Sequence, residues 1–415
     1  MFDSGSSSFE KLKIWSSKKL RNSLDWYLSV STNKMPAKYL IASKVEIETE
    51  DIDQLSYNEL WGLHEKATRT FLSYWKKAKS DPFFIIDLPF PKYSLLSLNS
   101  VIVNKGLTSC DFCEWHCGVD RTDPNGKKGT CKLGTVSRVA SYFPHHGEEL
   151  VFRGTKGSGT IFFSSCNMRC VFCQNGDISK DKDNGIPITP LRLSLIMFEL
   201  RALGVHNINL VGGDPTPHLH TIINAIQRLP QIHRYNINEK EEHIRWLGKL
   251  KQNKNNYLFK NWFNVPILWN SNFYISKEAM KILRTVIDVW LPDFKFGNNK
   301  CAHRLSRTPK YFETITRNLK LIHSWGENYV IRHLVMPNHV DCCSIPVLKW
   351  IKDNIPDAPV NIMGQYHPDS FTDPLSPLYS DRYSDISRRV SKTEVAEVWE
   401  YAEELGLNFE NVTFY

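Results

Sequence analysis

The sequence has no long hydrophobic run and no dense block of charge of one sign. No window of about 18 consecutive apolar residues occurs, and runs such as Phe83–Ile86 are far too short to span a bilayer, so an integral membrane protein is not expected. Lys and Arg number 52 against 44 Asp and Glu, a formal net charge of +8. No five or six basic residues cluster as they do in a phosphate-tracking tail. The charge therefore favours anionic partners in general and does not by itself indicate nucleic acid.

The N-terminal stretch also lacks the apolar segment of about 7 to 15 residues that a secretory signal requires. It mixes Lys11, Lys13 and Lys18 with the acids Asp3 and Glu10 instead. A reducing, cytoplasmic location is therefore expected, and the serine and basic residues leave a mitochondrial location open. With 41% hydrophobic and 23% charged residues, the composition is that of an ordinary globular protein.

The patterning divides the chain into four predicted segments. Residues 1–100 form a partly helical N-terminal extension, in which Asn58–Lys79 carries apolar residues at helical spacing. Residues 101–158 are a cysteine-rich leader with turn signals. The core is expected at 159–370, with a polar, solvated insertion at 231–261, and a helical segment follows at 371–415.

Short β-branched or aromatic runs alternate with amphipathic helical patterns from Thr160 onward. The predicted strands are Thr160–Ser164, Asn207–Val211, Val265–Trp269, Val289–Phe294, Tyr329–Val335 and Pro359–Met363. Thr189 opens a helix that Gly204 closes, and Ser276 and Ser344 open two more. This order predicts an α/β fold of parallel βα units, either a doubly wound sheet or a partial (βα)6 barrel of the TIM type.

Seven of the ten cysteines fall within one stretch of 64 residues, which suggests metal ligation. Three of them, Cys166, Cys170 and Cys173, directly follow the first predicted strand, where barrel folds place their sites. A structural zinc ion would need four protein ligands, and a catalytic one three plus water. A 4Fe-4S cluster held by three thiolates would leave one iron open to a substrate or cofactor.

This loop carries a motif with a known counterpart. The string reads Cys166-Asn167-x-Arg169-Cys170-x-Phe172-Cys173-x-Asn175. Its cysteine spacing resembles the signature of the radical S-adenosylmethionine (SAM) superfamily, and the wider string resembles the pyruvate formate-lyase activating enzymes and their uncharacterised paralogues. The resemblance covers roughly Cys110–Met363. It implies a partial (βα)6 barrel over this span and a 4Fe-4S cluster on the three cysteines. It also implies reductive cleavage of SAM to a 5′-deoxyadenosyl radical that abstracts hydrogen from a substrate.

A second string ends the second predicted strand. Gly212 and Gly213 would let a ligand approach the backbone, and the Asp214 carboxylate can accept hydrogen bonds from an ammonium group. In the resembled family such a Gly-Gly-acid motif binds the amino end of the SAM methionine. The family's acid is usually Glu, so Asp214 has a shorter reach.

Polar residues also close the later strands, at the end where barrels carry out chemistry. Asp293 and Lys295 share one face of their strand, and the resemblance implies that this Asp-x-Lys contacts SAM. Arg332, His333 and His367 also lie at strand ends. The sequence does not decide whether each contributes to the site or has a structural role, as an ion-pair partner or as a core histidine. The residues assigned to cofactor binding are Gly212, Gly213, Asp214, Asn270, Asp293, Lys295, Arg332 and His367. No catalytic residue is assigned beyond the ligands of the cluster and of SAM.

Upstream, four more thiolates are close in sequence. Cys110, Cys113, Cys117 and Cys131 are enough for a second metal site, which is either zinc or an iron-sulfur cluster. Cys301 and the Cys342-Cys343 pair are predicted to be ordinary buried thiols.

These features predict a radical SAM enzyme of the activating-enzyme type, an oxidoreductase of unidentified substrate. Its expected partners are a low-potential electron donor and, as a candidate substrate, a glycyl-radical protein. Two alternatives stay open. A radical SAM enzyme that modifies RNA is supported only by the net charge and the Lys-rich insertion, and a non-catalytic zinc or iron-sulfur binding module would use the Cys110–Cys131 set.

Overall fold

Parallel strands form the core of the chain in the computed structural model, which describes residues 9–10, 12–234, 257–410 and 412–413. The parallel strands are β2 (Ser158–Phe163), β4 (Ile208–Gly212), β7 (Ile267–Ser271), β8 (Val289–Pro292), β9 (Asn328–Tyr329), β10 (Ile331–Leu334) and β11 (Val360–Met363). They pair in that order, and a parallel bridge between Asp293 and Arg332 joins the β8 side to the β10–β11 pair. This arrangement confirms the predicted partial barrel, and each predicted strand lies within two residues of an observed one.

An antiparallel edge precedes the parallel strands. β1 (Ser137–His145) pairs with β2 on one side and with β3 (Ile186–Ile188) on the other. The sequence analysis placed residues 137–145 in the leader and did not predict a strand there. β1 is only partly buried along its length, so its hydrophobic alternation is weak, as is common for strands near a sheet edge.

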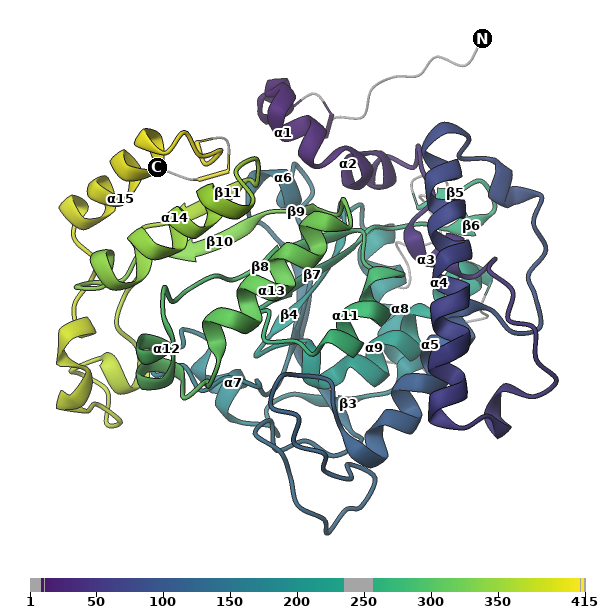
Figure 1. The fold of residues 1–415 in the computed structure, drawn as a ribbon, viewed down its shortest axis with the longest axis horizontal. Coiled ribbons are helices and arrows are strands. Elements are labelled where there is room, and N and C mark those ends of the chain that lie inside the picture. The colour runs from purple at the N-terminus through teal and green to yellow at the C-terminus, as the bar shows by residue number, and fades with distance from the viewer. Residues whose placement is uncertain (1–8, 11, 235–256, 411, 414–415) are drawn as a thin grey trace.

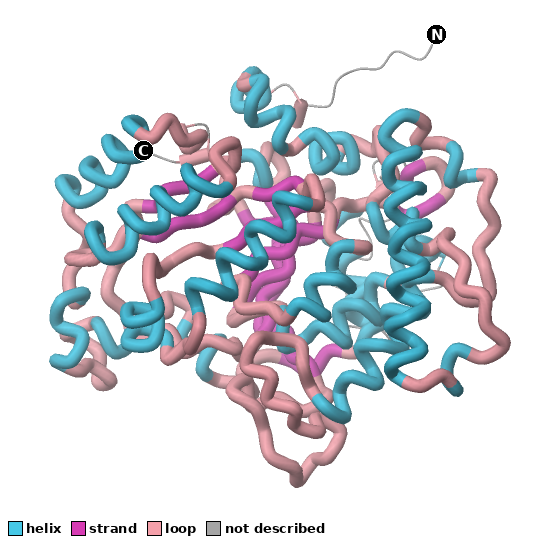
Figure 2. Tube along the Cα trace, in the orientation of Figure 1, coloured by secondary structure: helices cyan, strands magenta, loops and turns pink. Residues whose placement is uncertain are grey.

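Helices follow the core strands and cover their outer faces (Figures 1 and 2). They are α6 (Leu150–Arg153), α7 (Gly176–Lys180), α8 (Pro190–Ala202), α9 (Leu219–Ile226), α11 (Lys277–Arg284), α12 (Asn299–Ser306), α13 (Tyr311–Ser324) and α14 (Ile345–Asn354). The predicted caps are confirmed at Thr189 and Ser276, whose hydroxyls accept from backbone N–H groups at 3.2 Å. Ser344 differs, because its hydroxyl bonds His333 Nε2 at 2.8 Å.

The N-terminal extension contributes α1 (Lys18–Ser23), α2 (Asp25–Ser31), α3 (Lys38–Ala42), α4 (Tyr57–Ser80) and α5 (Leu95–Lys105). The helix predicted over 58–79 is α4, which begins with a capping box of Ser56 and Glu59. α4 packs on α5, and α5 packs on α9. α2 lies at the amino ends of the strands, where the Trp26 indole donates to Asp288 at 2.9 Å (Figure 1, top).

Residues 110–136 of the cysteine-rich leader have mostly loop structure and lie at the opposite end of the molecule (Figure 2, bottom). The buried guanidinium of Arg121 connects them to the core, since Nε donates to the Gly134 carbonyl at 3.0 Å and Nη1 to the Pro217 carbonyl at 2.8 Å. At the C-terminal side, α15 (Lys392–Glu404) follows β11 after a long loop region.

The predicted polar insertion at 231–261 lies mostly outside the described residues. Its two ends are described, and the second carries the short hairpin of β5 (Leu258–Phe259) and β6 (Trp262–Phe263). Within the described part of the chain, no helix combines the length and the apolar character needed to cross a membrane.

Candidate active site

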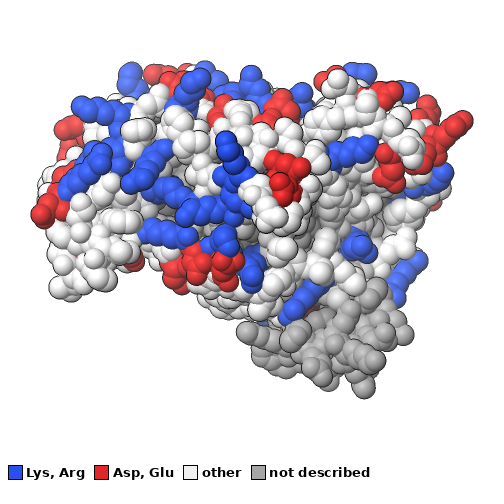
Figure 3. Space-filling view, turned by 90° about the horizontal axis from the view of Figure 1, so that it is seen from below, with Lys and Arg blue, Asp and Glu red and all other residues white. Residues whose placement is uncertain are grey.

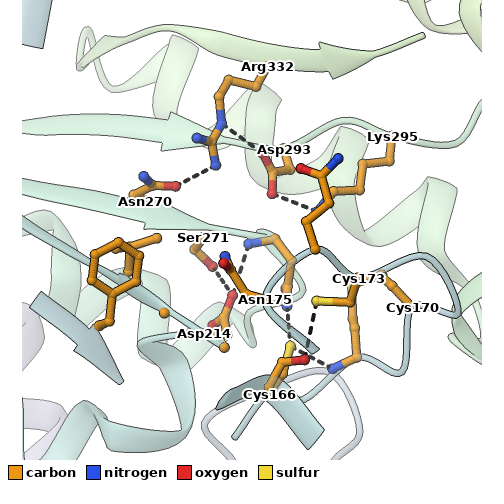
Figure 4. A pocket seen from close by; sticks show the side chains of 18 of the residues that line it. Cys166, Cys170, Cys173, Asn175, Asp214, Asn270, Ser271, Asp293, Lys295 and Arg332 are labelled. Atoms are coloured by element: carbon orange, nitrogen blue, oxygen red, sulfur yellow. Dashed lines mark hydrogen bonds and ion pairs between the residues drawn. The ribbon is translucent and has the colours of Figure 1, made fainter. Parts of the chain in front are cut away.

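A cavity of about 380 Å³ opens at the carboxyl ends of the core strands (Figure 4). The predicted residues that line it are Cys166, Cys170, Cys173, Gly212, Gly213, Asp214, Asn270, Asp293, Lys295 and Arg332. They come from loops and strand ends spread over 167 residues of chain, from 166 to 332. His367 is the exception, since it is not a lining residue and its Nδ1 lies 3.2 Å from the Pro368 carbonyl oxygen. Tertiary structure therefore brings nearly the whole predicted set to one place.

The cysteine loop is held in place by its backbone. The amides of Arg169 and Val171 donate to the Ser306 and Leu305 carbonyls at 3.1 and 2.9 Å, at the last turn of α12. Ser165, the residue before the first cysteine, has a left-handed backbone with φ of 70°. The loop therefore leaves β2 through a sharp turn and is fixed against a helix from another βα unit.

Hydrogen-bond donors already point at two of the three sulfurs. The Met168 amide and the Asn272 side-chain amide lie 3.3 and 3.4 Å from Cys166 Sγ, and the Ser179 hydroxyl lies 3.2 Å from Cys173 Sγ. Burial raises the pKa of Cys166 well above its usual value and that of Cys170 to about 12. One buried and two half-buried thiols, with donors aimed at two of the three sulfurs, fit an iron-sulfur cluster, whose binding displaces the thiol protons.

Glycine is required at the end of β4 because another backbone lies against it. A Cβ on Gly213 would lie 1.8 Å from the Ser165 carbonyl oxygen, and Gly212 has φ of 125°. The sequence argument attributed these glycines to the approach of a ligand. The structure shows that the close neighbour is the backbone that leads into the cysteine loop, although both glycines also line the cavity.

Asp214 connects two strands as well as lining the cavity. Its Oδ2 accepts from the Ser271 hydroxyl and the Asn272 amide at 2.9 Å each, and its Oδ1 accepts from the Thr216 amide at 2.9 Å. Burial raises the pKa of this carboxyl, and the hydrogen bonds oppose that shift. The short side chain therefore ties the end of β4 to the end of β7, and its assignment to SAM stays a prediction.

Opposite the cysteines, one buried acid lies between two cations (Figure 4). Asp293 Oδ2 is 2.6 Å from Lys295 Nζ, and Oδ1 is 2.9 Å from Arg332 Nε. Burial alone would raise the pKa of Asp293, but Arg332 and Lys295 outweigh it and the pKa is lowered. The group thus carries one net positive charge, which suits an anionic ligand group such as a carboxylate.

Asn270 extends this charged group toward the cavity. Its Oδ1 accepts from Arg332 Nη2 at 2.5 Å. Its Nδ2 is buried and has no hydrogen-bond partner among the described residues. A buried donor without a partner is costly in free energy, so a ligand that accepts from it would be favoured.

A pair of acids that no predicted sequence motif includes also lines the cavity. Glu148 and Glu149 lie just before α6, and Glu149 Oε1 accepts from the Asn361 side chain at 2.8 Å while Oε2 has no partner among the described residues. Burial raises the pKa of Glu149 to about 7 despite the nearby Arg332. An adjacent acid pair directly after a strand-like run was the available signal, but that run was not recognised as β1.

The leader cysteines lie close to the cluster loop without forming a compact group. Cys110 Sγ is 3.8 Å from Arg121 Nη1, and Cys113 forms a backbone bridge with Ile275. Among the described residues, no three of the four leader cysteines have ligand atoms within 4.8 Å of one another. The thiols are nevertheless near one another, since that of Cys113 interacts electrostatically with those of Cys110 and Cys131, and a second metal site, zinc or an iron-sulfur cluster, stays a prediction.

A different set of cysteines does gather. Cys301, Cys342 and Cys343 lie with His339 so that one ligand atom of each falls within 4.8 Å of all the others. The prediction that these three are ordinary buried thiols missed this grouping. The His339-x-x-Cys342-Cys343 spacing was a usable signal, but Cys301 joins only through the fold.

The chain carries a radical SAM superfamily domain. The family model of that name matches residues 160–351. The chain is also 38% identical over 388 residues to the uncharacterised protein MJ0674 of Methanocaldococcus jannaschii, an alignment that covers 92% of this chain and 97% of that protein. Such a domain implies an enzyme that uses a 4Fe-4S cluster and SAM, in agreement with the three-cysteine loop at the cavity.

The solved structures that resemble the chain are more distant. SuiB of Streptococcus suis bound to the precursor peptide SuiA has 15% identity and a TM-score of 0.40, over 62% of this chain and 48% of that one. SuiB bound to S-adenosylmethionine has 14% identity and a TM-score of 0.39, over 60% of this chain and 48% of that one. The chain thus spans about half the length of SuiB.

Proposed function

We propose that the chain cleaves SAM reductively to generate a 5′-deoxyadenosyl radical, as an oxidoreductase of the activating-enzyme type. One observation supports this most directly. A single cavity joins the three-cysteine loop to the Asp293, Lys295 and Arg332 group and to the Gly212–Asp214 turn. These are the positions that the motif resemblance associates with a cluster and with SAM.

In this proposal the cysteines hold the cluster and the strand ends hold SAM. Cys166, Cys170 and Cys173 would hold the cluster, which would supply the electron for cleavage when bound. Lys295 and Arg332 would orient an anionic part of SAM, and the free Asn270 amide would donate to an acceptor on it. Burial in the cavity would keep water away from the radical chemistry.

The first test is formation of 5′-deoxyadenosine. The full-length chain is reconstituted anaerobically, given dithionite and SAM, and compared with Cys170→Ala. We expect product from the wild type alone, because two thiolates cannot hold the cluster that SAM must contact. Absence of product from a wild type that binds about four irons per cluster would contradict the proposal.

For the substrate, we propose a glycyl-radical protein as the partner, on the basis of the wider motif Cys166–Asn175. The test incubates the reconstituted chain, SAM and a low-potential donor with a glycyl-radical protein from the same organism. A glycyl radical seen by electron paramagnetic resonance, and absent with Cys170→Ala, would support it. A wild type that forms 5′-deoxyadenosine without that signal would exclude this partner and retain the SAM chemistry.

A second candidate function is modification of RNA, which a basic cavity of about 390 Å³ favours. Its lining includes Lys132, Arg169, Lys180 and Arg307, and two of these also border the candidate active site. On the face seen in Figure 3, Lys and Arg form a band with Asp and Glu beside it. RNA binding that weakens steeply with salt, and less steeply in Arg307→Ala, would support this function. Salt-independent or absent binding would exclude it.

A further inference from the structure

Four potential metal ligands converge between two βα loops. Cys301 lies in the first turn of α12, and His339, Cys342 and Cys343 lie around the π-helical turn Val340–Ser344 before α14. His339 and Cys343 are buried, with exposed fractions of 3% and 1%. No part of the proposed SAM chemistry uses these residues.

The distances among the ligand atoms match those around one tetrahedral ion. Zinc bonds of about 2.3 Å to sulfur and 2.0–2.1 Å to nitrogen place neighbouring sulfurs about 3.8 Å apart, and nitrogen about 3.6 Å from sulfur. Cys342 Sγ lies 3.7 Å from Cys301 Sγ and 4.0 Å from Cys343 Sγ. His339 Nδ1 lies 3.2 and 3.4 Å from Cys342 and Cys343. A multi-iron cluster would hold the same ligands further apart.

The surroundings support ligation by thiolates. Asn298 Nδ2 donates to Cys301 Sγ at 3.4 Å and to the Cys342 carbonyl at 2.7 Å, so one amide joins both loops. A Cβ on Gly297 would lie 2.7 Å from the Cys343 carbonyl oxygen, so glycine lets the two loops meet. Hydrogen bonds and packing contacts of this kind keep metal ligands oriented.

The imidazole has an acceptor for its second nitrogen. When Nδ1 of His339 binds a metal, Nε2 carries the ring proton. Asp385 Oδ2 lies 3.4 Å from Nε2, and the same carboxylate accepts from Arg304. Arg304 Nη2 is also 2.9 Å from Nε2 and can only donate, so protonation of Nε2 on metal binding requires this guanidinium group to turn away, toward Asp385, which it already contacts. A carboxylate behind the histidine is the usual arrangement at zinc sites.

We propose that Cys301, His339, Cys342 and Cys343 form a structural zinc site, separate from the SAM cavity and from the cysteine-rich leader. All four positions are protein ligands, as in structural rather than catalytic zinc sites. Three thiolates and one Zn²⁺ carry one net negative charge, which the neighbouring Arg304 offsets.

A zinc ion at this site would rigidify α12, the helix that holds the cluster loop in place. Zinc would fix the first turn of α12, and the last turn of α12 accepts the amides of Arg169 and Val171. Through Asp385 it would also hold the C-terminal segment against α12. Loss of the ion should therefore raise hydrogen exchange at the Arg169 and Val171 amides.

The test measures zinc and its ligands in the full-length chain purified anaerobically. Elemental analysis should find a zinc that is lost in Cys342→Ser and in His339→Ala but retained in His303→Ala, a change on the exposed side of α12. Zinc-edge X-ray absorption on the wild type should show three sulfurs at about 2.3 Å and one nitrogen at 2.0–2.1 Å. Hydrogen exchange of the cluster loop is measured on the same samples.

The outcomes distinguish this zinc site from a zinc site in the leader and from the absence of a zinc site. Zinc bound by four sulfurs would place it in the leader and overturn the proposal, as would zinc unchanged in Cys342→Ser, absence of zinc from the wild type, or a Cys301–Cys342 disulfide in its place. If Cys342→Ser fails to fold, the wild-type absorption spectrum still decides between three and four sulfurs. Failure of SAM cleavage alone leaves this proposal standing, because the zinc measurements need no activity.

Discussion

At the residue scale, the ionisation of the charged group in the cavity depends on neighbouring charges of opposite sign. Asp293 is buried and stays ionised because Lys295 and Arg332 lie on its two oxygens. Each cation in turn is kept charged by the acid, since Asp293 opposes the effect of burial on the pKa of both. Removing Asp293 would leave both cations without this acid, whereas removing one cation leaves Asp293 paired with the other.

Lys295→Met is therefore expected to weaken SAM binding by about 10- to 100-fold, because a hydrogen bond to a charged group contributes about 1.5–3 kcal/mol. Asp293 would keep Arg332 as its partner, so the fold should survive. Equilibrium dialysis of SAM with the reconstituted chain measures the change. Lys300→Met, on the exposed surface of α12, is the matched control, and equal binding in the two variants would exclude a role for Lys295.

Glu149 should make stability depend on pH. Its folded pKa, about 7, lies above the value of an unfolded glutamate because burial disfavours the charged form. The stabilisation by the protonated acid is thus present at acid pH and is lost as the pH rises toward 7. Relative to Glu149→Gln, the wild type should lose about 2 kcal/mol of unfolding free energy between pH 5 and 8. Denaturant titrations at both pH values measure this, and parallel pH profiles would contradict it.

At the element scale, the end of β4 and the start of the cysteine loop share one narrow space. Phe163 of β2 pairs with Gly212 of β4, and the chain then turns at Ser165 into Cys166. The Gly213 amide donates to the Phe163 carbonyl at 2.7 Å, and the Asp214 amide to the Ser165 carbonyl at 3.0 Å. The Gly212–Asp214 motif is therefore hydrogen-bonded to the residues that lead into the cysteine motif.

Gly213→Ala should accordingly disturb the cluster loop. The new Cβ would lie 1.8 Å from the Ser165 carbonyl oxygen, so the backbone before Cys166 must move. We expect iron content after reconstitution to fall at least several-fold. Gly62→Ala, in α4 with no atom within 4 Å of the new Cβ, should retain full iron and gain about 0.5–1 kcal/mol of stability. Full iron in Gly213→Ala would show that the loop adapts.

At the scale of the whole molecule, α1 and α2 of the N-terminal extension lie at the amino ends of the strands, while α4 and α5 pack at the side, next to α9 (Figure 1). Tyr27 donates its amide to Asn328 at 2.8 Å, and Asp288 accepts from the Lys38 amide at 2.9 Å. Lys38 also forms a fully buried ion pair with Glu327. The extension is thus part of the folded core.

Lys38→Ala should therefore destabilise the whole chain by about 3–5 kcal/mol, because it leaves the Glu327 carboxylate buried without its partner. Thermal or denaturant unfolding measures the loss. Lys66→Ala is the comparison, since Lys66 and Glu48 form an ion pair with exposed fractions of 67% and 81%, and it should cost less than about 1 kcal/mol. Similar losses in both variants would contradict a structural role for the extension.

Local sequence patterns were sufficient to predict much of the fold and of the site. Strand runs such as Val289–Phe294 and caps such as Thr189 act over a few residues, so periodicity and capping chemistry predicted them. β1 was missed because a strand next to the sheet edge with partial burial has little hydrophobic alternation. The Glu148–Glu149 pair was missed with it, because nothing in the local sequence shows that these acids face Asn361 of β11, more than 200 residues later.

The sequence by itself determined the superfamily, the order of the βα units and the three cysteines of the cluster loop, because close spacing in the chain places their thiols close in space. Only the tertiary structure decided which distant groups meet. It paired Asp293 with Arg332, left the Asn270 amide free at the cavity, excluded His367 from the lining, and joined Cys301 to His339, Cys342 and Cys343. Each of these depends on how parallel strands align their carboxyl ends, which no local pattern specifies.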